Sequence, residues 1–237
     1  TSGWGLTETA PGALVQHEPA KGAGIIGAPL PGVVTKLLDD GTGRMETRVK
    51  GPSIFERYYG NAEKTADAFD QEGFFKTGDA MRFVDPEDVD RGLQFDGRTS
   101  EDFKLSTGTW VHAAQIRLEM IACLGPYAQD VIVCGHGRDE VGILIVPGPK
   151  AQAGQTDAGA LLSDAVQDIR ERVHDISSVT TGSARRVVRA LVLADPPDIG
   201  AGEMTAKGNI NFARLLERRA HLVERLYDDD DAASILT

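Results

Sequence analysis

Short apolar stretches separated by Gly, Pro and Asp occupy roughly the first 100 residues and predict a strand-dominated region. Residues 44–51 ("RMETRVKG") have the pattern of a strand that ends in a Gly-Pro turn. Residues 79–85 and 92–97 enclose a loop rich in Pro and Asp, and they predict a hairpin. A short helix is expected over residues 61–70, where apolar residues recur at helical spacing.

The pattern changes after Gly97, where helical spacing becomes common. Residues 112–125 predict an amphipathic helix, and two more helices are expected around residues 162–173 and over about residues 212–227. Three apolar strands are predicted, at residues 130–135, 141–147 and 185–195. The second part of the chain is therefore expected to be a small α+β unit with a three-stranded sheet and flanking helices.

Composition and charge narrow the possible partners. The net charge of −11 argues against nucleic acid and anionic membrane surfaces as partners, since both are polyanions. Both cysteines, Cys123 and Cys134, lie among apolar residues and are expected to be reduced core residues of a cytoplasmic protein. Four aspartates, Asp228 to Asp231, follow the last helix, whose C-terminal end carries a partial negative charge that repels them. They are therefore expected to lie in a frayed, solvated tail.

The stretch "GWGLTET" (3–9) has the chemistry of a nucleotide site. Its glycines allow close backbone approach, Thr7 can donate to a phosphate oxygen, and Glu8 is a hard-oxygen ligand suited to Mg²⁺. The alternative interpretation, a surface turn with a helix N-cap, is equally consistent with these residues.

Two further stretches allow two interpretations each. In "GFFKTGDA" (73–80), the carboxylate of Asp79 can accept both hydroxyls of a ribose, although an Asx-turn before a strand explains the same residues more simply. In "FDGRTSEDFKLSTGTWV" (95–111), Arg98 and Lys104 lie where the composition changes, so this segment is either a hinge between domains or a charged connector.

Two further stretches contain glycine, and only the second keeps a functional interpretation. "KGAGIIG" matches the dinucleotide fingerprint G-x-G-x-x-G, but "APLPG" follows where that fingerprint requires a helix, so the match is rejected. In "GEMTAKGNIN" (202–211), Lys207 is either a solvated loop lysine or a side chain that reaches a site elsewhere.

Together, four motifs in this order give the chain a resemblance to the adenylate-forming superfamily of acyl- and aryl-CoA synthetases. They are "GWGLTE", "KTGD", "GRTSEDFKLSTG" and "MTAKGNI", and the resemblance covers essentially the whole chain. The stretches "GWGLTETAP", "DVIVCGHGRDEVG", "GSARRVVRALVLADPP" and "EMTAKGNIN" are most similar to the feruloyl-CoA synthase type of aromatic acid–CoA ligase.

This resemblance implies an activity and a domain plan. Such enzymes use ATP to convert a carboxylic acid to an acyl-adenylate, release pyrophosphate, and then transfer the acyl group to CoA. Residues 1–99 would be the strand-rich, β-barrel-like end of the large AMP-binding domain. Residues 100–237 would form the small, mobile C-terminal domain, with a hinge near Ser100, where the family usually has Asp or Lys.

The resemblance also assigns roles to individual residues. Trp4 would stack on adenine, Thr7 would contact the α-phosphate, and Glu8 would bind Mg²⁺. Asp79 and Arg98 would hold the ribose. In the second part, Lys104 would lie near the adenylate, and Gly108 would belong to the loop that lines the pantetheine tunnel of CoA. The implied catalytic residues are Thr7, Lys104 and Lys207.

Lys207 departs from the family pattern. The late motif of the family usually reads Thr-x-(Ser/Gly)-Gly-Lys, and an ungapped alignment places Asn209 at the usual lysine position, with Lys207 two residues earlier. Either Lys207 serves from a shifted loop, which we favour, or the loop has lost its lysine. The nearby cluster Arg185, Arg186 and Arg189 can meet CoA phosphates or form a solvated strand end.

The resemblance further implies a longer parent protein. The family's phosphate-binding loop and most of the acid pocket are expected upstream of residue 1, so the first part would expose apolar surface without that missing N-terminal part. We expect this chain alone to be inactive. The alternatives are a non-catalytic module that binds a nucleotide or pantetheine, or a ligase for a fatty acid; a homodimer is possible.

Overall fold

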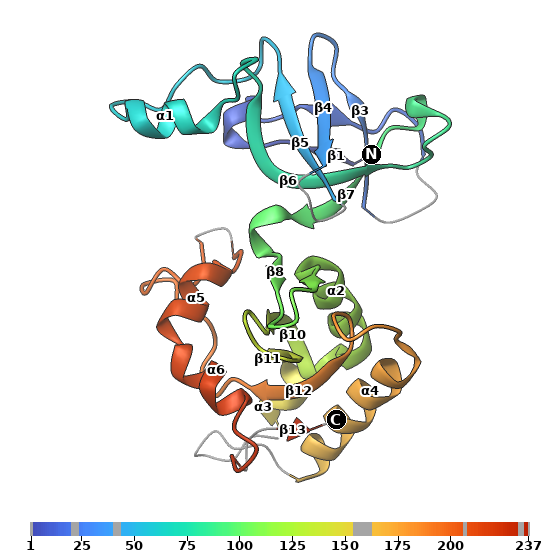
Figure 1. The fold of residues 1–237 in the computed structure, drawn as a ribbon, viewed down its shortest axis with the longest axis vertical. Coiled ribbons are helices and arrows are strands. Elements are labelled where there is room, and N and C mark those ends of the chain that lie inside the picture. The colour runs from blue at the N-terminus through green and yellow to red at the C-terminus, as the bar shows by residue number, and fades with distance from the viewer. Residues whose placement is uncertain are drawn as a thin grey trace. The chain divides into compact units, whose positions relative to one another are not determined.

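The computed structural model describes residues 2–19, 24–39, 44–153, 163–205, 208–231 and 235–236. The chain divides into two compact units, Thr1–Ser100 and Glu101–Thr237, and each is described by itself. Figure 1 shows the first unit in blue to green and the second in green to red.

The first unit is built on one antiparallel sheet of seven strands in the order β1-β2-β3-β7-β6-β5-β4. The strands are β1 (Gly3–Trp4), β2 (Leu14–Val15), β3 (Ile25–Pro29), β4 (Val34–Asp39), β5 (Met45–Lys50), β6 (Phe75–Phe83) and β7 (Leu93–Arg98). The predicted strand at 44–51 and the predicted hairpin are confirmed as β5 and as β6 with β7. Strand β6 begins earlier than expected, at Phe75, so "KTGD" lies within a strand and not in a turn before one.

Short helical segments complete this unit. They are the 3₁₀ turns η1 (Thr7–Thr9), η2 (Val89–Arg91) and η3 (Thr99–Glu101) and the helix α1 (Ala62–Ala68). The predicted helix at 61–70 is confirmed as α1, and the Asn61 side chain caps it by accepting a hydrogen bond from the backbone N–H of Lys64 at 2.9 Å. After Gly27 the chain continues in strand β3 and not in a helix, as the rejection of the dinucleotide fingerprint requires.

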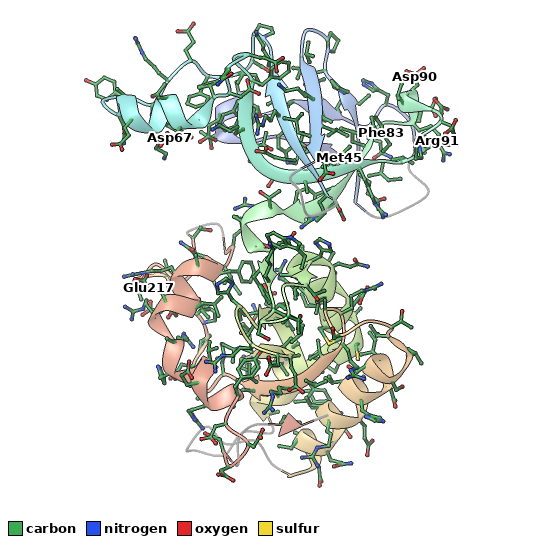
Figure 2. The ribbon with its side chains drawn as sticks, viewed as in Figure 1. Met45, Asp67, Phe83, Asp90, Arg91 and Glu217 are labelled. Atoms are coloured by element: carbon green, nitrogen blue, oxygen red, sulfur yellow. The ribbon has the colours of Figure 1, made fainter. Side chains whose placement is uncertain are left out.

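The core of the first unit is small. Its main cluster of buried apolar side chains consists of Ala13, Leu14, Ile26, Val33, Val49, Phe75, Met81 and Leu93. Other apolar side chains of the same sheet reach solvent: Met45 and Phe83, both labelled in Figure 2, are 39% and 38% exposed. These strands therefore carry partly exposed apolar side chains, and whether a missing N-terminal part covers them stays a prediction.

The second unit has a mixed four-stranded sheet in the order β10-β11-β12-β13. Its strands are β10 (Ala128–Cys134), β11 (Val141–Pro147), β12 (Val187–Val192) and β13 (Ile235–Leu236), and β11 pairs with β12 in parallel. The three predicted strands are confirmed, and the short strand β13 is an addition at one edge. Separately, β8 (Phe103–Lys104) and β9 (Trp110–Val111) form a two-stranded ribbon.

Helices pack on both faces of this sheet (Figure 1). They are α2 (Ala113–Leu124), α3 (Pro149–Ala153), α4 (Ser163–Val179), α5 (Phe212–Arg218) and α6 (Ala220–Leu226). Alternate residues of β11 serve opposite faces: Ile143 and Ile145 pack with α2 and α4, whereas Leu144 packs with α5 and α6. Because both faces are covered, β11 reads as a continuous apolar run.

Two expectations about the C-terminal region need correction. The predicted helix over 212–227 is broken into α5 and α6 at Arg219. The guanidinium of Arg219 binds the buried carboxylate of Glu203 through Nη2–Oε2 at 2.6 Å and Nε–Oε1 at 3.0 Å. The aspartate segment is also not simply a solvated tail, because Asp229 binds Arg189 at 2.6 Å and Asp231 binds Arg225 at 2.7 Å.

Candidate functional site

A pocket of about 410 Å³ lies in the first unit, where the motifs "GLTE" and "KTGD" come together. Glu8, Thr77, Gly78 and Arg98 line it, together with residues of the α1 region and with Ser100, the predicted hinge residue. Residues separated by many positions in the sequence thus converge on one cavity, as a binding site requires.

The turn that carries Thr7 and Glu8 is fixed by its own side chains and by close backbone packing. The hydroxyl of buried Thr9 accepts a hydrogen bond from the N–H of Leu6 at 2.8 Å and donates to the carbonyl of the same residue at 3.0 Å. A Cβ atom on Gly5 would meet the carbonyl oxygen of Pro11 at 1.6 Å, so only Gly fits there. This arrangement leaves Thr7 exposed and Glu8 half-buried at the pocket.

Glu8 is held by the segment that precedes α1. The hydroxyl of Tyr58 donates a hydrogen bond to Oε1 of Glu8 at 3.0 Å, and the N–H of Phe55 donates to the Glu8 carbonyl at 2.9 Å. Burial and the neighbouring carboxylate raise the pKa of Tyr58, so its hydroxyl remains a donor at neutral pH. Tyr58 and Lys64, which also line the pocket, were not among the residues predicted from the sequence.

Asp79 lies in β6 directly opposite Arg98 in β7. Its Oδ1 is 3.5 Å from Nε of Arg98, and its Oδ2 accepts a hydrogen bond from Nε1 of Trp4 at 2.8 Å. Asp79 is only 3% exposed, and this burial raises the pKa of its carboxyl group, while the Trp4 hydrogen bond and the Arg98 charge act in the opposite direction. Three of the predicted residues, Trp4, Asp79 and Arg98, are therefore in direct contact.

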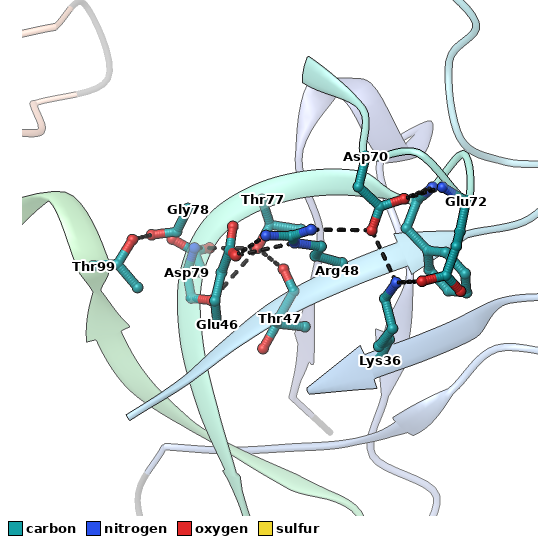
Figure 3. A network of polar contacts seen from close by, with 11 residues as sticks. Lys36, Glu46, Thr47, Arg48, Asp70, Glu72, Thr77, Gly78, Asp79 and Thr99 are labelled. Atoms are coloured by element: carbon teal, nitrogen blue, oxygen red, sulfur yellow. Dashed lines mark hydrogen bonds and ion pairs between the residues drawn. The ribbon is translucent and has the colours of Figure 1, made fainter. Parts of the chain in front are cut away.

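The "KTGD" segment is braced by a polar network, shown in Figure 3. The hydroxyl of Thr77 donates to the carbonyl of Thr47 at 2.5 Å and accepts from the N–H of Asp79 at 3.1 Å. The hydroxyl of Thr99 donates to the carbonyl of Gly78 at 3.1 Å. These bonds fix both ends of the Gly78 position, where φ is +71° and Gly is favoured.

The same network continues to the turn before β6 (Figure 3). Asp70 accepts hydrogen bonds from Lys36 at 2.9 Å and Arg48 at 3.0 Å, and from the backbone N–H groups of Glu72 and Phe74 at 3.0 and 2.9 Å. The Lys36 ammonium, above all, holds the pKa of Asp70 well below its usual range. Asp70 therefore stays ionised and anchors the turn that leads into "KTGD".

Lys104 and Gly108 belong to the second unit. The Lys104 ammonium lies 4.9 Å from the centroid of the Trp110 ring across the β8–β9 ribbon. The ribbon is tied to the β10–β11 turn because Gly137 N–H donates to the Lys104 carbonyl at 2.9 Å and Ser106 N–H donates to the Arg138 carbonyl at 2.8 Å. Gly108 has φ +81° at an exposed turn, where a Cβ atom would meet open space.

Lys207 lies outside the described residues. On either side of it, Thr205 N–H donates to the carbonyl of Asn209 at 2.8 Å, and Gly208 N–H donates to the carbonyl of Thr205 at 2.9 Å. Asn209, at the usual lysine position of the family motif, is exposed and donates its N–H to the hydroxyl of Thr205 at 3.1 Å.

Two of the three arginines of the basic cluster are engaged with carboxylates. Arg185 binds Glu119 at 2.7 Å, and Arg189 binds Glu140 at 3.0 Å in addition to Asp229. These partners reduce the positive charge available to an external phosphate, which weakens the cluster as a CoA phosphate site.

The described residues contain neither a group of three or more His, Cys, Asp or Glu side chains placed to hold a metal ion nor a helix long and apolar enough to cross a membrane. Both thiols are free, with Cys134 buried and Cys123 half-buried.

The model of the family described as AMP-binding enzyme C-terminal domain matches residues 102–231. A long-chain-fatty-acid–CoA ligase, FadD15 of Mycobacterium bovis, is 26% identical over 239 aligned residues, which cover 96% of this chain and 38% of that ligase.

Two solved structures share the fold. The adenylation domain of a carboxylate reductase from Mycobacterium chelonae has a TM-score of 0.71 at 24% identity, covering 86% of this chain and 32% of that one. The A-PCP didomain of a carboxylic acid reductase from Segniliparus rugosus, in complex with AMP, has a TM-score of 0.68 at 24% identity, covering 95% and 30%. These likenesses confirm the predicted α+β fold, and this chain spans between 30% and 38% of the length of these relatives.

Proposed function

Because the chain belongs to the AMP-binding enzyme C-terminal domain family, we propose that it is the C-terminal portion of an ATP-dependent, AMP-forming acid–thiol ligase. The observation that carries the proposal is the convergence of Glu8 and Arg98 on one pocket, with Asp79 held beside it by Trp4 and Arg98. The proposed reaction joins a carboxylic acid to the AMP of ATP, releases pyrophosphate, and then transfers the acyl group to the thiol of CoA.

The residues of the pocket have distinct roles in this proposal. Asp79 accepts the ribose hydroxyls, Arg98 holds the ribose from the opposite strand, and Trp4 contacts the adenine. Trp4 already uses its indole N–H to fix the Asp79 carboxylate, so its ring face is the part that meets a base. Thr7, exposed on η1 beside Glu8, donates to the α-phosphate.

The donor set fits magnesium delivered with a nucleotide. Glu8 offers a carboxylate of which one oxygen is bound by Tyr58, and Mg²⁺ is usually held by one or two carboxylates together with substrate phosphates and water. Bound there, the ion would neutralise the negative charge that grows on the α-phosphate during attack by the acid. Glu8 would orient it, and Thr7 would add a hydrogen bond to the same phosphate.

Lys104 and Lys207 complete the proposed machinery from the second unit, and Gly108 contributes to the CoA tunnel. A lysine brought to the adenylate stabilises the charge of the first half-reaction, and a unit that moves about Ser100 withdraws it for thioester formation. Gly108 lies in an exposed turn with open space at its Cβ position, so the turn itself does not obstruct a ligand such as pantetheine. The full-length protein would be cytoplasmic.

We propose an aromatic acid of the feruloyl or cinnamoyl type as the substrate, on the strength of the sequence stretches that resemble feruloyl-CoA synthases. A fatty acid is the second candidate, because one relative covered along almost the whole of this chain is named a long-chain-fatty-acid–CoA ligase. A non-catalytic module that binds a nucleotide or pantetheine is the remaining alternative.

Pyrophosphate release by the full-length parent tests the function and the substrate together. The parent would be assayed with ferulate, other cinnamates, benzoates and fatty acids of several lengths, with CoA present and absent. We expect ATP- and acid-dependent pyrophosphate release, fastest with cinnamates, and none from the 237-residue chain alone. Absence of activity with every acid would overturn the ligase proposal, and a clear preference for fatty acids would replace the aromatic one.

The role of Lys207 is tested by a matched pair of variants in the parent. Lys207→Ala should lower the rate of the adenylation half-reaction at least ~100-fold, a loss typical of one electrostatic donor to a transition state. Asn209→Ala, at the usual lysine position, should leave that rate within about twofold, since a surface residue outside the chemistry changes little. Equal rates for the two variants would contradict the assignment of Lys207.

A further inference from the structure

Tyr58 stands out among the pocket residues because it touches the proposed magnesium ligand and has no role in the function proposed above. Its hydroxyl donates to Oε1 of Glu8 at 3.0 Å. Within the described residues no hydrogen bond reaches Oε2 of Glu8, so that oxygen is the one left for a cation or its water. The hydrogen bond therefore both orients the carboxylate and selects the oxygen that it presents.

Tyr58 is itself held rigidly, as an orienting residue must be. Its N–H donates to the hydroxyl of Thr65 in α1 at 3.0 Å, and its ring packs against the ring of Phe55 with centroids 4.7 Å apart. The Phe55 N–H in turn donates to the carbonyl of Glu8 at 2.9 Å. The same short segment thus fixes the backbone and the carboxylate of Glu8 together.

Lys64 adds an electrostatic contribution. Its ammonium lies 4.1 Å from the centroid of the Tyr58 ring, where a cation is attracted by the π-electrons. A positive charge over the ring withdraws electron density from the phenol and makes its hydroxyl a stronger donor to Glu8. Lys64 is exposed on α1, so this contact does not depend on core packing.

We propose that Tyr58 is a positioning residue for Glu8, which it holds in the orientation that binds the nucleotide-bound magnesium ion, and that Lys64 supports it through the ring. This inference rests on the proposed function, since it concerns the same site. Residues that orient a metal ligand from behind typically change metal affinity by about 10- to 100-fold when they are removed.

The test compares two neighbouring tyrosines in the full-length parent. Tyr58→Phe removes the hydroxyl that binds Glu8, whereas Tyr59→Phe removes a hydroxyl from a side chain that is fully exposed. For Tyr58→Phe we expect the Mg²⁺ concentration at half-maximal pyrophosphate release to rise about 10-fold, with a smaller change in kcat at saturating Mg²⁺. Tyr59→Phe should match the unaltered enzyme in both.

A second readout does not require turnover. Binding of Mn²⁺ in the presence of ATP, followed by electron paramagnetic resonance, should be about 10-fold weaker in Tyr58→Phe and unchanged in Tyr59→Phe. Lys64→Met, on the exposed face of α1, should weaken Mn²⁺ binding about threefold in the same direction, and it keeps the inference testable if Tyr58→Phe does not fold.

The outcomes distinguish failure of the Tyr58 proposal from failure of the ligase proposal. A parent that is active, with Tyr58→Phe and Lys64→Met indistinguishable from Tyr59→Phe in Mg²⁺ and Mn²⁺ dependence, overturns the role of Tyr58 and leaves the ligase proposal standing. A loss of kcat in Tyr58→Phe without any change in metal dependence also overturns it. A parent that neither releases pyrophosphate nor binds Mn²⁺ with ATP overturns the ligase proposal itself.

Discussion

The two units bury their apolar side chains in different ways. In the second unit, apolar side chains alternate on the two faces of the sheet, and helices cover both, so the central strands carry almost no polar side chains. In the first unit the core is smaller, and one residue of the candidate site is part of it: Asp79 is buried in the strand that also contributes Phe75 and Met81. Stability and site chemistry therefore overlap in the first unit and are separated in the second.

The largest effect is expected from the apolar sheet of the second unit. Leu144→Ala removes a fully buried side chain from β11 and should lower the free energy of unfolding of that unit by about 3 kcal/mol, through lost burial and the cavity left behind. Calorimetry of the chain should show this loss of stability in the unfolding transition of the second unit. Leu118→Ala, at a position 65% exposed on α2, is the control and should change unfolding by less than about 0.5 kcal/mol. A small effect of Leu144→Ala would break the contrast between the units.

The second effect concerns a buried carboxylate of the second unit, that of Glu203. Glu203→Gln replaces the carboxylate that Arg219 binds and should cost about 2 kcal/mol at pH 7, the range for hydrogen bonds to charged groups. Arg219 lowers the pKa of Glu203 to about 2, whereas the unfolded chain titrates near the ordinary value of 4.5.

The sign of the pH dependence follows from this difference. The contribution of Glu203 is fully present above pH 4.5 and is lost as the pH falls toward 2. Urea unfolding of the natural chain and of Glu203→Gln should therefore give curves that differ at pH 7 and converge at low pH. A difference that stayed constant with pH would show that lost packing, and not charge, explains the variant.

The third effect concerns Asp79, which belongs both to the buried interior of the first unit and to the candidate site. Trp4→Phe keeps an aromatic ring but removes the N–H donor to Asp79, and it should cost about 1.5 kcal/mol at pH 7. Because Trp4 acts against the burial that raises the pKa of Asp79, the variant should raise that pKa further.

Carbon NMR of the Asp79 carboxyl group would measure this change, with Trp110→Phe in the second unit as the matched control. The destabilisation should be present where Asp79 is ionised and should disappear at a pH low enough to protonate it. An unchanged Asp79 titration in Trp4→Phe would mean that the indole N–H does not control the carboxylate.

The smallest effect is expected on the surface of the second unit. Arg185→Ala breaks the contact with Glu119, in which both side chains are partly exposed, and should change the free energy of unfolding by about 0.5 kcal/mol or less. The difference should vanish at high salt, which thermal unfolding at two ionic strengths would show. A salt-independent loss would indicate that the arginine stem packs against the protein.

Local spacing predicted β5, β6, β7 and α1 in the first unit and the three long strands and main helices of the second, because apolar periodicity depends on neighbouring residues. It did not predict the separate strands β3 and β4 of the first unit. It missed the start of β6 at Phe75, because "KTGD" is polar and lacks the apolar pattern of a strand. The polar side chains of this segment find their partners in Thr47, Trp4 and Arg98, which are distant in the sequence. It also joined α5 and α6, because the break at Arg219 is fixed by Glu203, a partner in a preceding loop.

The candidate site was likewise predicted only in part by local sequence motifs. Motifs identified Trp4, Glu8, Asp79 and Arg98, three of which touch, but no local pattern distinguishes Tyr58 from its neighbour Tyr59. The bond between Tyr58 and Glu8 joins residues 50 positions apart, and only the tertiary structure decides which tyrosine faces the carboxylate. The structure shows where most of these side chains lie, but the binding roles of Trp4, Glu8, Asp79, Arg98 and Gly108 and the catalytic roles of Thr7, Lys104 and Lys207 stay predictions.

The placement of the two tryptophans gives each unit its own fluorescent reporter. The chain has two tryptophans; Trp4 lies in the first unit with its N–H on the carboxylate of Asp79, and Trp110 lies in the second unit beside the ammonium of Lys104. Indole emission responds to nearby charge, so each signal reports on a residue assigned to the nucleotide or the adenylate. With one tryptophan replaced at a time, the arrival of a ligand in either unit can be followed in real time without adding a label.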